Sequence, residues 1–125
     1  MERERAADLP PAGFDYAAFR RACEAKDVAA WLPFYADDAE WVEYRQSDPP
    51  RSPHRLTGRA AIGEFLTAVA HADVVLELGA EVVGTARAAF RVTITRGDGR
   101  RIIEHVILEL RDGRIARQVE VEAWD

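Results

Sequence analysis

The sequence lacks several features that would identify a function directly. It contains one cysteine, Cys23, which excludes an intramolecular disulfide and a cysteine-based metal cluster. No stretch approaches the roughly 20 apolar residues that a membrane-spanning helix needs. Residues 1–13 are charged and contain prolines, unlike a secretory signal peptide. We therefore expect a cytoplasmic protein that is not embedded in a membrane.

Basic and metal-binding motifs are also scarce. Lys26 is the only lysine, the arginines are scattered, and the net charge is −5, which argues against nucleic acid or an anionic membrane as a partner. The three histidines, His54, His71 and His105, are far apart in the sequence and lack a metal-ligand spacing. We predict no metal site, and the function that we expect needs no cofactor.

The length and composition indicate one folded domain. A chain of 125 residues with 48% hydrophobic and 31% charged residues can bury one core. Residues 1–12 are highly charged and end near Pro10-Pro11, so we predict a flexible N-terminal tail. Residues 13–125 are then a single domain.

Hydrophobic periodicity predicts three helices in the first part of the chain. The first begins at Asp15, the second at Asp27, and the third after Gly58. Pro33 predicts an irregular end to the second helix. The residues expected on the buried helix faces include Phe19, Trp31, Leu32, Tyr35, Ile62 and Leu66.

The second part of the chain has the period of two that is typical of strands. A short strand is expected over residues 40–45, followed by a proline-rich loop over 46–56. From Val74 onward, four strands follow one another, with tight turns at Gly97-Asp98-Gly99 and Asp112-Gly113. In the first of these strands, alternate residues from Val74 to Val82 should share one face. The fold class predicted is α+β, with three N-terminal helices packed on a strongly curved antiparallel sheet.

Glu104 is the first candidate catalytic residue. It is the only polar residue among Ile102, Val106, Leu108 and Leu110, which share its face of a predicted strand. Burial there would raise its pKa, and a neutral carboxylic acid can donate a hydrogen bond to a developing oxyanion. The alternative is a structural ion pair with Arg91 or Arg101.

Glu43 is the second candidate. It shares strand parity with Trp41, and an inward orientation would make it a general base in an aromatic pocket. An outward orientation would make it a solvated strand residue. Glu120 and Glu122 alternate with Val119 and Val121, a pattern that predicts a half-exposed strand.

Several of these segments together resemble a known family. Residues 14–65 contain a Tyr35-Ala36-Asp37-Asp38-Ala39 turn, a proline loop and a Gly58-Arg59-Ala60-Ala61-Ile62 helix start. With the Asp112-Gly113 turn and the C-terminal Trp124-Asp125, they resemble the nuclear transport factor 2-like superfamily, and more narrowly its bacterial SnoaL-like proteins. The resemblance implies a cone-shaped fold with a pocket between sheet and helices. It also implies a homodimer formed through the outer sheet face.

The steroid-isomerase branch of this superfamily allows a comparison of individual residues. Its catalytic aspartate would correspond to Glu43, and its protonated aspartate to Glu104, by analogy with ketosteroid isomerase, the known example of a neutral carboxylic acid acting as a donor. The oxyanion tyrosine of that branch would correspond to Phe19, which has no hydroxyl group.

Two functions follow from these residues. One is a cofactor-independent isomerase or cyclase that transfers a proton on a small apolar carbonyl compound, with Glu43 and Glu104 as the catalytic residues. The other is a non-catalytic module that binds a hydrophobic ligand or a second subunit. The side chains expected to contact the ligand are Tyr16, Phe19, Tyr35, Trp41, His54, Phe65, Phe90 and Trp124.

Overall fold

A computed structural model describes residues 13–125, so the predicted tail over residues 1–12 lies outside the described part. The helical elements are α2 (Tyr16–Ala25), α3 (Val28–Trp31), the 3₁₀ turn η1 (Leu32–Phe34) and α4 (Arg59–His71). The strands are β1 (Tyr35–Tyr44), β2 (His54–Thr57), β3 (Val74–Val83), β4 (Arg87–Arg96), β5 (Arg101–Arg111) and β6 (Arg114–Trp124).

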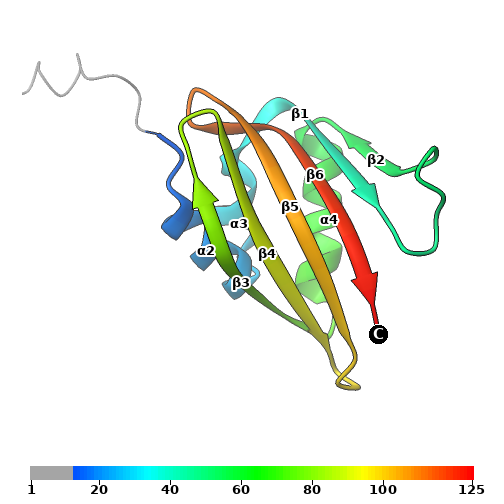
Figure 1. Cartoon of the computed structure of the whole chain (residues 1–125). Helices are drawn as coiled ribbons and strands as arrows, with labels where there is room; N and C mark the ends of the chain where they lie inside the picture. The colour runs from blue at the N-terminus through cyan, green and yellow to red at the C-terminus, as the bar shows by residue number, and fades with distance from the viewer. Residues whose placement is uncertain (1–12) are drawn as a thin grey trace, which may run out of the picture.

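The six strands form one curved sheet in the order β2-β1-β6-β5-β4-β3. Neighbouring strands are antiparallel except β1 and β6, which run parallel. The helices lie against one face, which we call the inner face, and leave the other face uncovered (Figure 1). This arrangement confirms the predicted α+β class.

The three predicted helix starts are confirmed, the first two by side-chain caps. The carboxylate of Asp15 accepts a hydrogen bond from the backbone N–H of Ala18, and Asp27 does the same for Ala30. Lys26 ends α2 with a φ of 55°. Its ammonium group donates to the carbonyl oxygens of Ala72 and Val74, which ties the end of α2 to the start of β3.

The second helix is shorter than predicted, and the assignment of Tyr35 to it is wrong. The α-helical part covers four residues and gives way to the 3₁₀ turn at Leu32, just before Pro33. Proline provides no backbone N–H to continue the hydrogen bonds of the helix. Tyr35 is therefore extended and begins β1, five residues before the predicted strand.

Two strands also differ from the sequence-based prediction. Residues 54–56 were expected in the loop, but the segment His54–Thr57 pairs with Glu40–Glu43 of β1 and forms β2. In β3, the pairing register shifts between Gly79 and Val82, and Ala80 has a φ of 55°. Ala80 and Val82 are exposed at this bulge whereas Leu76 and Leu78 are buried, so the prediction that all four share one face is wrong.

The core lies between the inner face and the helices. Its largest fully buried side chains come from every layer: Tyr35, Phe19, Ile62, Leu66, Leu108 and Ile115. The predicted inner residues of β4, Ala88, Phe90 and Val92, are buried as expected. Within residues 13–125, no helix is long and apolar enough to cross a membrane.

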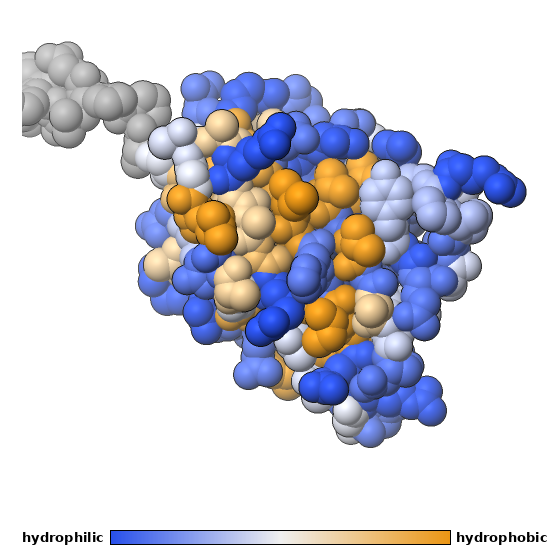
Figure 2. Space-filling view, in the orientation of Figure 1, coloured by the Kyte–Doolittle hydropathy of each residue, from blue (hydrophilic) through white to orange (hydrophobic). Residues whose placement is uncertain are grey.

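The outer face of the sheet exposes large apolar side chains. Val75 on β3, Ile107 on β5 and Val121 on β6 are each more than half exposed. Figure 2 shows hydrophobic surface on this side of the molecule, spread across the strands. Both faces of β5 and β6 therefore carry apolar residues.

Candidate active site

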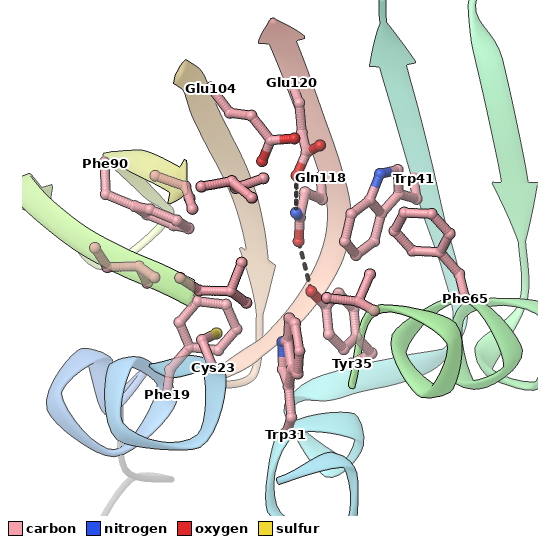
Figure 3. A pocket seen from close by; sticks show the side chains of 15 residues that line it. Phe19, Cys23, Trp31, Tyr35, Trp41, Phe65, Phe90, Glu104, Gln118 and Glu120 are labelled. Atoms are coloured by element: carbon pink, nitrogen blue, oxygen red, sulfur yellow. Dashed lines mark hydrogen bonds between the residues drawn. The ribbon is translucent and has the colours of Figure 1, made fainter. Parts of the chain in front are cut away.

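A cavity of about 80 Å³ lies between the helices and the inner face of the sheet. Aromatic rings form most of its wall, and the amide and carboxyl groups in its lining come from Glu104 on β5 and from Gln118 and Glu120 on β6. Figure 3 shows the two carboxyl groups together at one end, with the rings around the remaining space. An engineered cavity of about 150 Å³ is known to bind benzene. A ligand as large as benzene must therefore extend beyond this smaller cavity.

Glu104 and Glu120 are brought close together by the antiparallel pairing of β5 and β6. In this pairing Glu104 is opposite Glu122, and Val106 is opposite Glu120. Glu104 is 8% exposed and Glu120 is 2% exposed. Burial is the main reason why the pKa of each carboxyl group lies well above its ordinary value, and charge repulsion between the neighbouring carboxylates adds to it.

Hydrogen bonds make the two members of this pair unequal. Donation from Gln118 favours the ionised form of Glu120 and lowers its pKa in part. Contact with Glu122 instead raises the pKa of Glu104. Glu120 is therefore the member of the pair that accepts a hydrogen bond from Gln118.

Glu120 is held by a short chain of buried polar groups. The Tyr35 hydroxyl donates to Oε1 of Gln118 over 2.6 Å, and Nε2 of Gln118 donates to Oε2 of Glu120 over 2.6 Å. Figure 3 shows this chain descending from Glu120 to Tyr35 along one side of the cavity. The other oxygen of Glu120, Oε1, is buried and has no N–H or hydroxyl donor.

Glu43 is buried and lies beside the cavity, outside its lining. The side chain is 3% exposed, so the alternative of a solvated strand residue is wrong. Its Oε1 accepts from the indole N–H of Trp41 over 3.0 Å, and its Oε2 accepts from Nε of Arg45 over 2.7 Å. Burial raises the pKa of Glu43, and the hydrogen bond from Arg45 opposes this rise.

Neither predicted arginine partner compensates Glu104. Arg91 is exposed, and Arg101 pairs with Asp125 at the end of the chain. Because no hydrogen bond or ion pair in residues 13–125 joins an arginine to Glu104, the structural-pair alternative has no support here.

A group of three carboxylates lies next to the cavity. One oxygen each from Glu43, Glu120 and Glu122 lies within 4.8 Å of the others, which is close enough to share a metal ion. The guanidinium group of Arg45 already forms an ion pair with Glu43, one of the three carboxylates. The oxygens are of the type that Mg²⁺ or Ca²⁺ prefers, but the guanidinium group would repel a cation.

The predicted ligand-contacting residues divide into two groups. Five line the cavity: Phe19, Tyr35, Trp41, Phe65 and Phe90. The other three, Tyr16, His54 and Trp124, lie outside the lining.

Each of these three has a different environment. The ring of Tyr16 packs on Phe90 with its centroid 5.7 Å away. Nδ1 of His54 lies 3.0 Å from a guanidinium nitrogen of Arg45. Trp124 is 38% exposed, and its indole N–H donates to Glu122.

The pattern of β6 predicted a half-exposed strand, but it did not predict that Gln118 and Glu120 point inward. Of the two sides of this strand, the one with Glu120 is buried, whereas Val121 on the other side is 57% exposed. A usable signal was present in β5, where Ile103 and Ile107 form an apolar stripe opposite Glu104. If the valines of the neighbouring strand β6 extend this outer apolar stripe, the polar residues that alternate with them must point inward.

Comparison with known proteins agrees with this geometry. A family model described as "SnoaL-like domain" matches residues 16–118. No curated protein matches the chain.

Solved structures show the same fold. A protein of unknown function from Mesorhizobium loti, described as NTF2-like (the nuclear transport factor 2 fold), is 21% identical with a TM-score of 0.75, over 86% of this chain and 87% of the other. A candidate ketosteroid isomerase from Kribbella flavida is 23% identical with a TM-score of 0.70, over 88% and 74%. A candidate polyketide cyclase from Sinorhizobium meliloti is 25% identical with a TM-score of 0.64, over 84% and 91%. These likenesses confirm the predicted nuclear transport factor 2-like fold.

Proposed function

Because the chain belongs to the SnoaL-like domain family, we propose that it is a cofactor-independent isomerase or cyclase acting on a small apolar carbonyl compound. The observation that carries the proposal is the pair of buried carboxyl groups, Glu104 and Glu120, at one end of an aromatic cavity. Pairs of carboxyl groups whose surroundings make one an acid and the other a base are typical of enzymes that transfer protons. Two of the similar structures are described as an isomerase and a cyclase.

The reaction begins with Glu104 protonated and Glu120 ionised. The apolar body of the substrate packs on the aromatic walls, and its carbonyl oxygen accepts a hydrogen bond from Glu104. Glu120 removes a proton from the carbon next to the carbonyl group, and the negative charge that moves to the oxygen is stabilised by the Glu104 donor. Return of the proton to another carbon completes an isomerisation. Attack of the enolate carbon on a second carbonyl group of the same molecule closes a ring. Both outcomes are redox-neutral.

The proposal gives the role of base to Glu120 instead of Glu43. Both oxygens of Glu43 already accept hydrogen bonds from Trp41 and Arg45, whereas Oε1 of Glu120 lacks a donor. Glu43 acts on the reaction through its charge, because its repulsion raises the pKa of Glu120. A more basic Glu120 is a stronger proton acceptor.

Phe19 limits the donors available for the oxyanion. Its ring lines the cavity without a hydroxyl group, and the nearby Tyr35 hydroxyl is engaged by Gln118. The donors that remain are the carboxyl group of Glu104 and the indole N–H of Trp31, which lines the cavity and has no hydrogen-bond partner.

Hydrogen–deuterium exchange tests the proposal. The protein is incubated in D₂O with a panel of small cyclic ketones and β,γ-unsaturated ketones, and NMR follows exchange at the carbon next to the carbonyl group. We expect Glu120→Gln to lower the enzymatic rate by about 10²–10⁴, and Glu104→Gln by about 10²–10³. The control is Glu77→Gln, which alters an exposed glutamate on β3. Equal exchange in Glu120→Gln and the unmodified protein would refute the assignment of the base.

The alternative is a non-catalytic module that binds an apolar ligand. It is favoured by the saturated hydrogen bonds of Glu43, which are typical of a structural ion pair. The same panel separates the two functions: saturable binding of ketones without exchange above the buffer rate supports the binding module.

We further propose that two copies associate through the outer sheet face. The support is the exposed apolar surface of β3, β5 and β6, where Val75, Ile107 and Val121 lie on separate strands. The cytoplasmic location and the absence of nucleic-acid and membrane partners remain predictions from composition.

A further inference from the structure

Tyr35 and Gln118 form a polar chain that reaches Glu120 from the closed side of the cavity. Tyr35 is completely buried, Gln118 is 3% exposed and Glu120 is 2% exposed. The two hydrogen bonds that join them are both 2.6 Å long. The three side chains come from the start of β1 and from alternate positions on β6, so two strands that run parallel hold the chain in place.

The direction of the hydrogen bonds follows from the chemistry of the three groups. A glutamine amide has one oxygen that accepts and one nitrogen that donates. If Glu120 is ionised, it can only accept, so the nitrogen of Gln118 must face it. The oxygen of Gln118 then faces Tyr35, whose hydroxyl must donate. A reversed amide would set the carbonyl oxygen of Gln118 against the carboxylate.

This direction assigns different tasks to the two oxygens of Glu120. Oε2 is held by Gln118, whereas Oε1 is buried and has no N–H or hydroxyl donor. The carboxylate therefore has one anchored oxygen and one available oxygen. An anchored Oε2 prevents the carboxylate from turning away from a substrate, because turning would break a buried hydrogen bond.

We propose that Tyr35 and Gln118 are positioning residues that orient Glu120, so that Oε1 is the oxygen that takes the proton from the substrate. This inference rests on the proposed function for its catalytic meaning, but the orientation itself can be measured without turnover. The role is distinct from that of an oxyanion donor, since the Tyr35 hydroxyl points to Gln118 and not into the free space (Figure 3).

The charged surroundings of Glu120 explain why it needs such an anchor. Glu104 faces it from β5, Glu43 from β1 and Glu122 from its own strand, and Cys23 contributes a buried thiol from α2. Arg45 is directed to Glu43. Gln118 is thus the neutral donor that favours the ionised form of Glu120 among several like charges.

The test is an NMR titration of the Glu120 carboxyl carbon in protein labelled with ¹³C-glutamate, with the signal assigned by Glu120→Gln. We expect Tyr35→Phe and Gln118→Leu each to raise the pKa of Glu120 by about one unit, because each weakens a hydrogen bond that favours the charged form. In the Gln118→Leu background, Tyr35→Phe should add nothing. Tyr16→Phe is the matched control, since its hydroxyl is buried but has no partner.

Two results would overturn the inference. One is an unchanged Glu120 pKa in Tyr35→Phe, and the other is an additive effect in the double variant. The unmodified protein provides an independent measurement in case a variant fails to fold. Its Gln118 side-chain amide protons should exchange slowly with solvent, and fast exchange would contradict an anchored amide.

The same variants separate this inference from the proposed function. If no ketone exchanges but the Glu120 pKa rises as expected, the orienting chain stands and the catalytic proposal fails. If exchange is found, the acidic limb of its pH profile should move to higher pH in Tyr35→Phe. A loss of rate with an unmoved profile would instead indicate general structural damage.

Discussion

The stability of this protein should decrease as the pH rises above 5, because its buried carboxyl groups take up protons on folding. An unfolded glutamate titrates near its ordinary pKa of 4.5, and the pKa values of native Glu104 and Glu120 lie well above it. Between the unfolded and the native pKa, the native state binds more protons than the unfolded state. The free energy of unfolding must then fall with rising pH.

The size of this effect follows from the number of protons involved. One proton bound only by the native state changes the free energy of unfolding by about 1.4 kcal/mol per pH unit. Glu104 and Glu120 titrate as a coupled pair, so one retained proton is the minimum. We therefore expect a loss of about 1.4 kcal/mol between pH 5 and pH 6. Asp38 has a pKa lowered by its bond to Arg111, and acts in the opposite sense below its ordinary value of 3.8.

Urea denaturation at pH 5, 5.5 and 6 measures this slope. Glu104→Gln replaces one of the two buried carboxyl groups with a neutral amide of similar shape, so it should reduce the slope by up to about 1.4 kcal/mol per pH unit. It should also make the variant more stable than the unmodified protein at neutral pH. Glu77→Gln, on the exposed side of β3, should keep the original slope. A stability that rises from pH 5 to pH 6, or equal slopes in Glu104→Gln and the unmodified protein, would refute the reasoning.

Two further predictions concern the ion pair and the outer face. Arg45→Met leaves the buried Glu43 carboxylate without its cation and should cost about 2 kcal/mol in urea denaturation, less than a fully buried pair because the Arg45 side chain is 30% exposed. Adding Glu43→Gln should recover most of that loss, and an equal or larger loss in the double variant would contradict the explanation. Val121→Arg should convert a dimer into a monomer in sedimentation equilibrium, whereas Val82→Arg, beyond the β3 bulge, should not. A monomeric unmodified protein would exclude association through this face.

The helices and most of the sheet were predictable because their signals are local. Asp15 and Asp27 bond to backbone N–H groups three residues later, so the sequence contains the whole cap. The alternation in β4 and β5 correctly placed Phe90 and Glu104 inside. The strand β2 was not predictable in the same way, because His54–Thr57 becomes a strand only through pairing with β1.

The sequence by itself determined the α+β class, the helix starts and the position of Glu104 on an apolar strand face, because each depends on a periodicity or a cap within a short segment. The tertiary structure alone decided which acidic residues meet. Glu120 lies inside because β6 has apolar residues on its outer face, and its neighbours Tyr35, Glu43 and Glu104 come from two other strands. Strand parity leaves the choice of face open when both faces carry apolar residues, and only the packing of the helices on one side makes that choice.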